Sequence, residues 1–191
     1  MDASYMIDPI IFVIDTLFSL YILAVMLRFI LQWVGADFYN PYSEFIVKIT
    51  HPPLKYFRRY IPSIGKIDTS CLIFALVLQM LAIFTILLLK GVSFSIGALT
   101  LRSFMQLLDM LINIFIFAIV ARAILSWLSA GSYNQAASIL HSLTEPVLRI
   151  CRKLVPVISG IDLSPLIALI GLQLSKMFIM PPLEQLMQVM G

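Results

Sequence analysis

Four long apolar stretches dominate the sequence and restrict the kinds of protein that it can form. Each holds about 20 or more mostly apolar residues, which is the length that an α-helix needs to cross the hydrocarbon core of a bilayer. Charged residues make up only 12% of the chain, whereas they make up about 25% of soluble domains. The sequence therefore predicts an all-α, polytopic membrane protein with four transmembrane helices, at about residues 9–33, 70–89, 103–127 and 161–183.

The lysine and arginine residues predict how these helices are oriented. Most of the 13 lie in the two longer loops, which join the first helix to the second and the third to the fourth, or at the helix ends that enter these loops. Because cytoplasmic loops are enriched in lysine and arginine, we expect both longer loops to be cytoplasmic. Both termini and the short link at residues 90–102 are then expected on the outer side.

The two halves of the chain match each other without a gap when Arg28 is aligned with Arg122. Many of the aligned residues are charged, polar, aromatic or proline, and chance similarity between two apolar segments does not align such residues. We therefore infer a tandem duplication. One helix–loop–helix unit occupies residues 1–96 and the second occupies residues 97–191, and units with an even number of crossings are parallel copies. The other matched pairs are Trp33 and Trp127, Asn40 and Asn134, Pro52 and Pro146, Pro62 and Pro156, Asp68 and Asp162, and Gln79 and Gln173.

The matched positions belong to two blocks that contain Arg-x4-Trp, Thr-x-Pro-x5-Arg and a Pro…Asp-x-Ser ending. These twin blocks resemble the signature of the YggT family, called YlmG in some bacteria, over nearly the whole chain. The second copy departs at one position, where Gln135 replaces Pro41. The resemblance implies a bacterial inner-membrane protein with chloroplast relatives, so the outer side, where the lysine and arginine residues place both termini, is the periplasm. For relatives it suggests links to osmotic or potassium stress, to cell division and to b-type cytochrome assembly in plastids, and it implies no catalytic residues.

The two longer loops predict amphipathic helices at the membrane surface. Asn40 before a proline is a typical helix start, and Pro52 is expected to end that helix and to begin a second one. In the second helix Leu54 and Phe57 form an apolar side that we expect to face the membrane, with the basic side toward lipid phosphates. The basic side holds Lys55, Arg58 and Arg59 in the first copy and Arg149, Arg152 and Lys153 in the second.

Two interpretations of these basic helices stay open. They anchor the loops to the membrane, or they form a docking surface for anionic lipids or for an acidic segment of a partner membrane protein. Asp68 and Asp162 precede the second helix of each unit, where a carboxylate stabilises the helix N-terminus. We expect them to cap these helices, and a contact with Arg58 and Arg152 is the alternative.

Two further matched pairs lie where the first and third spans enter the loops. Long basic side chains at such positions extend toward the lipid headgroups, and tryptophan is enriched at the same depth. We therefore expect Arg28 and Arg122 to reach the headgroups. Trp33 and Trp127 are expected beside them in the aromatic belt.

Polar residues inside the predicted spans are costly in hydrocarbon and are functional candidates. With a rise of about 1.5 Å per residue, Asp109 and Lys176 lie at similar depths, about 9–12 Å from the outer ends of their helices. An intramembrane ion pair is therefore expected. Asp15 matches Asp109 but has no matching lysine, so it either lies at the outer interface or shares Lys176. The neutral polar residues Gln79, Gln173 and Asn113 are expected to bond other helices, and a polar path for an ion is the alternative.

No motif for catalysis, phosphate binding or metal binding is found in the sequence. We therefore expect no enzymatic activity, no cofactor and no nucleic-acid partner. The favoured function is an accessory or scaffold protein that engages anionic membrane lipids or a partner membrane protein, or that forms homo-oligomers. The alternative is an oligomeric channel or transport-related protein for a small cation.

Overall fold

The computed structural model describes residues 4–65, 67–128, 135–154 and 162–190. Four of its helices are long and apolar enough to cross a membrane, which confirms the predicted all-α, four-span architecture of a multi-pass membrane protein. The helices are α1 (Ser4–Val34), α2 (Pro41–Tyr60), α3 (Thr69–Lys90), α4 (Ile96–Leu128), α5 (Gln135–Leu154) and α6 (Ser164–Met190).

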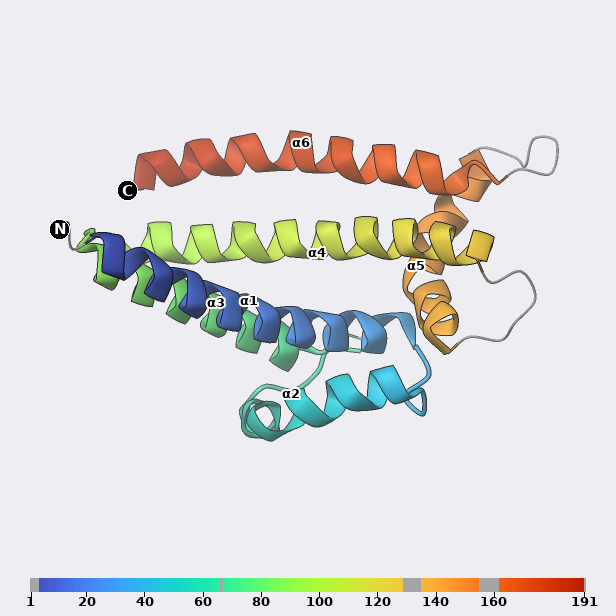
Figure 1. Cartoon of the computed structure of the whole chain (residues 1–191), viewed down its shortest axis with the longest axis horizontal. Coiled ribbons are helices and arrows are strands. Elements are labelled where there is room, and N and C mark those ends of the chain that lie inside the picture. The colour runs from blue at the N-terminus through green and yellow to red at the C-terminus, as the bar shows by residue number, and fades with distance from the viewer. Residues whose placement is uncertain (1–3, 66, 129–134, 155–161, 191) are drawn as a thin grey trace.

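The long helices lie side by side and follow the parallel arrangement that the duplication predicts. In Figure 1, α1 and α4 run in one direction and α3 and α6 run in the other. Both chain ends and the link from α3 to α4 lie at one end of the bundle, which we call the terminal end. The other end, where α1 and α4 lead toward α2 and α5, is called the loop end.

The four spans differ in how much protein surrounds them. Helix α4 contacts α3, α5 and α6 extensively and α1 over a small area, so it is the central span. Helix α6 contacts only α4 and α5 among the described elements. Only 6% of the most apolar part of α6 is buried inside the protein, compared with 33% for α4. Most of the surface of α6 is therefore left for lipid or for another protein.

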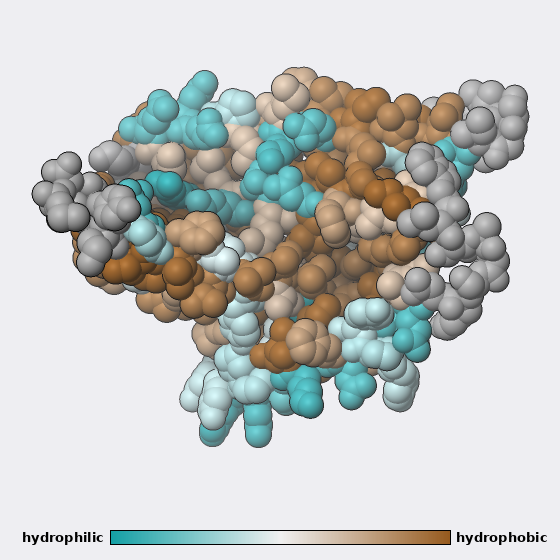
Figure 2. All heavy atoms as spheres, in the orientation of Figure 1, coloured by the Kyte–Doolittle hydropathy of each residue, from teal (hydrophilic) through white to brown (hydrophobic). Residues whose placement is uncertain are grey.

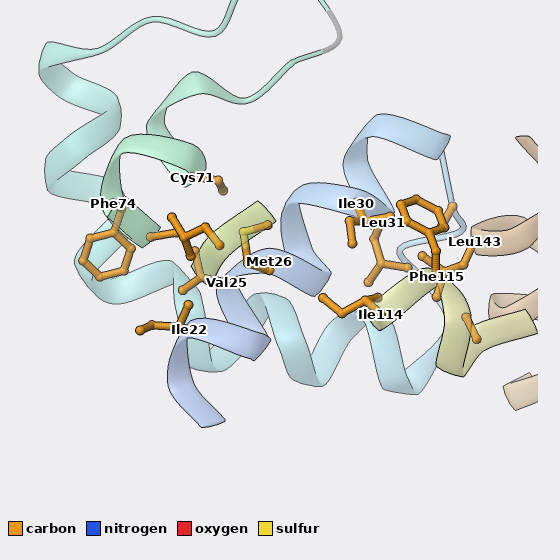
Figure 3. Packing of buried hydrophobic residues seen from close by; sticks show 14 of the residues in the cluster. Ile22, Val25, Met26, Ile30, Leu31, Cys71, Phe74, Ile114, Phe115 and Leu143 are labelled. Carbon is orange, nitrogen blue, oxygen red and sulfur yellow. The ribbon is translucent and has the colours of Figure 1, made fainter. Parts of the chain in front are cut away.

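Buried apolar side chains form one main cluster around the loop-end half of α1 (Figure 3). Ile22, Val25, Met26 and Ile30 recur at helical spacing, so they lie on one face of α1. Helices α2, α3, α4 and α5 all contribute to the same cluster, which means that the two copies share one core. The residues that they contribute include Leu54, Cys71, Phe74, Ile114, Phe115 and Leu143.

Helix α2 is a single helix, so the prediction of two helices that meet at Pro52 was wrong. Pro53 has no N–H group to bond the carbonyl of Ile49, but the hydroxyl of Tyr21 in α1 donates to that carbonyl at 3.3 Å. The second copy has valine at the position of Pro53 and phenylalanine at the position of Tyr21. The extra hydroxyl is thus present only in the copy with the extra proline. Helix α5 likewise continues through Pro146.

Two spans extend further toward the terminal end than predicted. Helix α4 begins at Ile96 instead of about residue 103. It follows α3 closely, because Gly91, whose φ of 64° suits glycine, caps the end of α3. Helix α6 continues through two prolines to Met190 instead of ending at about residue 183. At about 1.5 Å per residue, Asp109 and Lys176 are each about 20 Å from the terminal ends of their helices. They are therefore deeper than predicted, near the middle of the bundle.

Candidate functional site

At the loop end, an arginine of the first span of each copy bonds a threonine of the following helix. The Arg28 guanidinium donates to the Thr50 hydroxyl at 2.9 Å, and the Arg122 guanidinium donates to the Thr144 hydroxyl at 2.7 Å. Arg28 is only 4% exposed, so the prediction that it extends to the headgroups was wrong. Its charge is used to hold α2 against α1, with a second bond to the Val47 carbonyl at 3.2 Å.

A second arginine in each copy closes the loop onto the next span. Arg58 pairs with Asp68, and Arg152 pairs with Asp162 at 3.2 Å. We call these contacts the loop latches. Each carboxylate uses its other oxygen at the helix start, where Asp68 accepts from the Cys71 N–H at 3.3 Å and Asp162 accepts from the Ser164 N–H at 2.9 Å. Capping and pairing, which the sequence offered as alternatives, therefore occur together.

The latches keep their carboxylates ionised. Burial of Asp68 opposes its ionisation, but hydrogen bonds from Arg58 and Cys71 together outweigh burial and lower the pKa of Asp68. The hydrogen bond from the Ser164 hydroxyl is the largest influence on Asp162, and with Arg152 it lowers the pKa of Asp162 despite partial burial. Both ion pairs are therefore formed at neutral pH.

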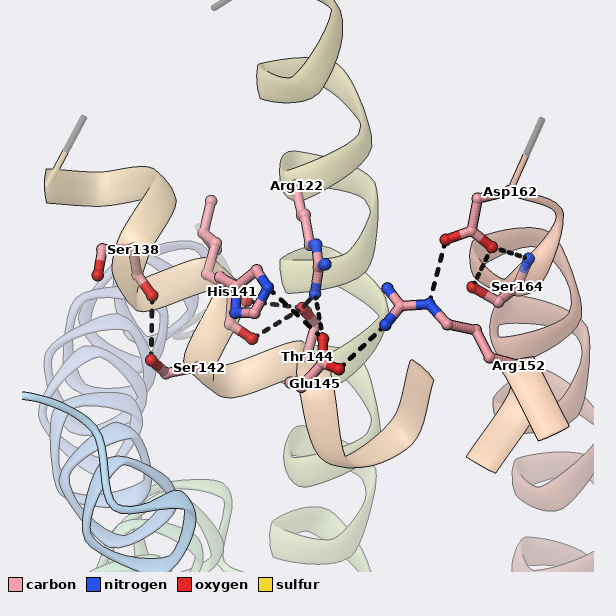
Figure 4. Close-up of polar contacts among 10 residues, drawn as sticks. Arg122, Ser138, His141, Ser142, Thr144, Glu145, Arg152, Asp162 and Ser164 are labelled. Carbon is pink, nitrogen blue, oxygen red and sulfur yellow. Dashed lines mark hydrogen bonds and ion pairs between the residues drawn. The ribbon is translucent and has the colours of Figure 1, made fainter. Parts of the chain in front are cut away.

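The second copy has a further acidic residue, Glu145, that the sequence analysis did not single out. Its carboxylate lies 3.3 Å from Arg122, 3.0 Å from Arg152 and 3.7 Å from His141. Figure 4 shows this continuous chain of charges from α4 through α5 to Asp162. Burial opposes the charge of Glu145, but the two arginines outweigh it and lower its pKa. The sequence does contain an indication of this site, because Glu145 stands at the position where the first copy has His51.

Asn40 connects the two copies. Its side-chain oxygen accepts from the Tyr42 N–H at 3.1 Å, as predicted for a cap of α2, and its amide donates to the Gln135 carbonyl at the start of α5 at 2.8 Å. Trp33 is partly exposed and packs edge-on against Phe115, 6.5 Å between ring centres. Other matched residues, namely Asn134, Pro156 and the side chain of Trp127, lie outside the described part of the chain.

The apolar side predicted for α2 faces the protein. Leu54 is fully buried in the main core, and the Phe57 ring packs on Phe74, with ring centres 4.8 Å apart. The prediction that these residues face the membrane was wrong, because hydropathy does not distinguish a lipid-facing side from a core-facing one. Tyr56 and Tyr60 of α2 are exposed, and in α5 Ile150 and Leu154, which the sequence places on the corresponding apolar side, are exposed as well.

Four of the six predicted basic residues form what we call the basic surface: Lys55, Arg59, Arg149 and Lys153. They occupy matching positions in α2 and α5, all are exposed, and within the described residues none of them forms an ion pair. Hydrophilic side chains project from α2 in Figure 2. Arg58 and Arg152 belong to the loop latches instead, so they are not free to dock onto a ligand in the way that the other four are.

A separate group of polar residues lies within the spans. The Lys176 ammonium is 2.6 Å from the Asp109 carboxylate, as expected. The Asn113 amide donates to Asp109 at 2.9 Å, and its oxygen accepts from Lys176 at 3.4 Å. Gln79 of α3 donates to Gln106 of α4 at 2.5 Å. Gln106 was missed because its matching position in the first copy is a phenylalanine.

Two cavities flank α4 at this depth. A cavity of about 650 Å³ lies on the α1 side of α4, and one of about 380 Å³ lies on the α6 side. Gln106 and Asp109 line both. Gln173 lines only the cavity on the α6 side, together with Lys176. Figure 2 shows hydrophilic atoms half-way along the bundle, with apolar surface on their loop-end side.

The chain was compared with known proteins. The sequence model of the CCB3/YggT family matches it twice, at residues 7–89 and 101–183. An uncharacterized protein of Pseudomonas aeruginosa is 43% identical over 171 residues, which cover 88% of this chain and 87% of that protein. The Escherichia coli K12 protein named YggT is 35% identical over 166 residues, 87% of this chain and 86% of its own. No solved structure matches.

Proposed function

Since the chain belongs to the CCB3/YggT family and carries the unit of this family twice, we propose that it is a non-enzymatic accessory or scaffold protein of the bacterial inner membrane. In this proposal the loop end faces the cytoplasm, because lysine and arginine are concentrated in the loops there. The basic surface then lies on the inner leaflet and binds anionic lipids, and it recruits partner membrane proteins to the same place.

The observation that carries this proposal is the repeated pairing of free cations with exposed apolar side chains. Lys55 and Arg59 of α2 are exposed next to Tyr56 and Tyr60. The matching positions in α5 repeat this pattern with Arg149, Lys153, Ile150 and Leu154. Helices of this kind lie in the interface with the apolar residues in the acyl region and the cations at the phosphates. Each cation near an anionic surface contributes about 1 kcal/mol.

The test reverses the charge of the four residues of the basic surface to glutamate. Purified protein is exchanged into vesicles that contain phosphatidylglycerol, and native mass spectrometry counts the anionic lipids that stay bound. We expect the wild type to retain phosphatidylglycerol over phosphatidylcholine and the variant to lose that preference. The same variant should also lose proteins that co-purify with the wild type in mild detergent.

A matched control uses two exposed cations at the terminal end, Lys90 and Arg102. Their reversal to glutamate should leave the retained lipid unchanged, because they are at the opposite end of the bundle. Arg58 and Arg152 are unsuitable as test residues, since their replacement breaks the loop latches and destabilises the fold. Retention of phosphatidylglycerol by the variant of the basic surface would contradict the proposal.

A transport-related role for a small cation is the second candidate. The observation in its favour is that carboxylate and amide groups of Asp109, Asn113 and Gln106 line cavities within the spans. The proposal predicts a potassium flux into vesicles that contain the purified protein, and loss of that flux in Asp109→Asn. Equal flux in protein-containing and empty vesicles would exclude it.

A further inference from the structure

One exposed carboxylate within the first span lacks the partner that its counterpart in the second copy has. Asp15 in α1 occupies the position that matches Asp109, yet no residue in the described ranges forms an ion pair or a hydrogen bond with its side chain. In the second copy Asp109 is bound by Lys176. The position that matches Lys176 is Ala82, which is buried in α3. The first copy thus carries the acid of this pair without the base.

Asp15 lines the larger cavity, which lies between α1 and α4. Ser19, Gln79 and Asp109 also line this cavity and give it a polar end. The opposite end is apolar and reaches Leu143 of α5 at the loop end. The cavity lies beside about 18 Å of α1, from Asp15 to Leu27, at about 1.5 Å per residue. It is therefore a long groove whose polar end lies about 12 Å from the terminal end of the span Ile7–Val34, at about 1.5 Å per residue.

The charges in this groove are unbalanced. Two carboxylates, Asp15 and Asp109, line it, and Lys176 neutralises only Asp109. An unpaired carboxylate within a span is costly and is normally found facing a partner or a water-filled site. A ligand for the groove therefore needs a positive group at the depth of Asp15, in the terminal-end half of the span, and an apolar body that extends toward the loop end.

Helix α6 of the same chain has the required form, since it is an apolar helix with one lysine near its middle that reaches the acid of α4. We propose that the groove between α1 and α4 binds a transmembrane helix of a partner protein, and that a lysine or arginine near the middle of this helix pairs with Asp15. This inference rests on the proposed scaffold function and adds the class of partner to it. The partner helix would complete in the first copy the pair that the second copy makes for itself.

The experiment uses the full-length protein in phosphatidylcholine vesicles, which contain no anionic lipid for the basic surface. Two apolar helical peptides of about 20 residues, with a central lysine or a central leucine, carry a dansyl group that accepts energy from the tryptophans of the protein. Single polar contacts within membranes correspond to about 3- to 30-fold in affinity. We expect the lysine peptide to bind more tightly than the leucine peptide by a factor in this range.

Asp15→Asn keeps the size of the side chain and removes its charge, so this preference should fall to about one. Asp8→Asn, which removes an exposed acid of α1 outside the groove, should leave it unchanged. Equal binding of the two peptides to the wild type, or an undiminished preference in Asp15→Asn, overturns the inference. So does a wild-type dimer that Asp15→Asn dissociates in the absence of peptide, because the occupant would then be a second copy.

The proposed scaffold function is judged by a different readout. Asp15→Asn should retain phosphatidylglycerol like the wild type, whereas the variant of the basic surface should lose the lipid and keep the peptide preference. If the peptide preference is absent while the lipid result is as expected, only the inference about the groove fails. If the lipid result also fails, the proposed function fails with it.

Discussion

Arg58 binds Asp68 across the turn that joins α2 to α3, and the matching contact between Arg152 and Asp162 joins α5 to α6. The two latches differ in burial, because the Asp68 side chain is 1% exposed and the Asp162 side chain is 41% exposed. A charge-assisted hydrogen bond contributes about 1.5–3 kcal/mol when it is shielded from water, and an exposed ion pair contributes about 0–1 kcal/mol.

The first prediction follows from this difference. Asp68→Asn should lower the free energy of unfolding by about 1.5–3 kcal/mol, and Asp162→Asn should lower it by less than about 1 kcal/mol. Thermal unfolding in one detergent measures both variants, with Asp37→Asn on the surface as a control. Equal losses for the two variants would show that burial does not set the strength of the latches.

The second prediction concerns pH. The pKa values of Asp68, Glu145 and Asp162 are lowered in the folded protein, so their stabilisation is complete above the ordinary carboxyl pKa of about 4. It is lost as the pH falls below that value and through the lowered pKa values. The melting temperature should be level from about pH 7 to 5 and should fall below about pH 4. Asp68→Asn combined with Glu145→Gln should make this fall shallower, and an equally steep fall in the double variant would contradict the assignment.

The third prediction tests the hydroxyl that replaces an N–H group in α2. Tyr21→Phe leaves the Ile49 carbonyl without its donor and should cost about 0.5–1.5 kcal/mol of stability. Pro53→Val restores a backbone N–H, as in the second copy, so Tyr21→Phe should cost less in the Pro53→Val background. A double-mutant cycle measures this coupling. A cost of Tyr21→Phe that is the same with and without Pro53 would rule out the proposed role of the hydroxyl.

The fourth prediction transfers the acid of the second copy to the first. Buried Arg28 bonds a hydroxyl and a carbonyl but, within the described residues, has no carboxylate within ion-pair distance, whereas its counterpart Arg122 has Glu145. His51→Glu places a carboxylate at the matching position and should stabilise the protein by about 1 kcal/mol. His51→Gln is the neutral control of similar size. If both variants have the same melting temperature, the added charge does not reach Arg28.

The spans and the duplication could be read from the sequence because both depend on properties that are local to the chain. A long apolar stretch has few alternatives to a membrane helix. The alignment of Arg28 with Arg122 needs only the sequence and does not depend on how the chain folds. The ion pair between Asp109 and Lys176 was predictable for the same reason, since helical rise alone places them at similar depths. Their depth in the bundle was not, because α4 begins at Ile96 and α6 continues through Pro181 and Pro182, so both helices are longer than their apolar stretches predict.

The inner-facing contacts could not be predicted in this way. Leu54 and Phe57 are as apolar as residues that face lipid, so only the packing of α2 against α1 and α3 shows that they are in the core. The role of the Tyr21 hydroxyl depends on a contact between helices that are separated in sequence. Glu145 differs from its matching residue, and a search for identical positions passes over it.

The sparse surroundings of α6 have a consequence for how the membrane acts on the molecule. A span with few protein neighbours changes its tilt when the thickness of the hydrocarbon layer changes, since little packing resists that motion. Lys176 on α6 is bound to Asp109 on α4, so tilting α6 strains the bond between them. Lipid chain length therefore bears directly on the strength of the charge pair between Lys176 and Asp109 within the spans of the second copy.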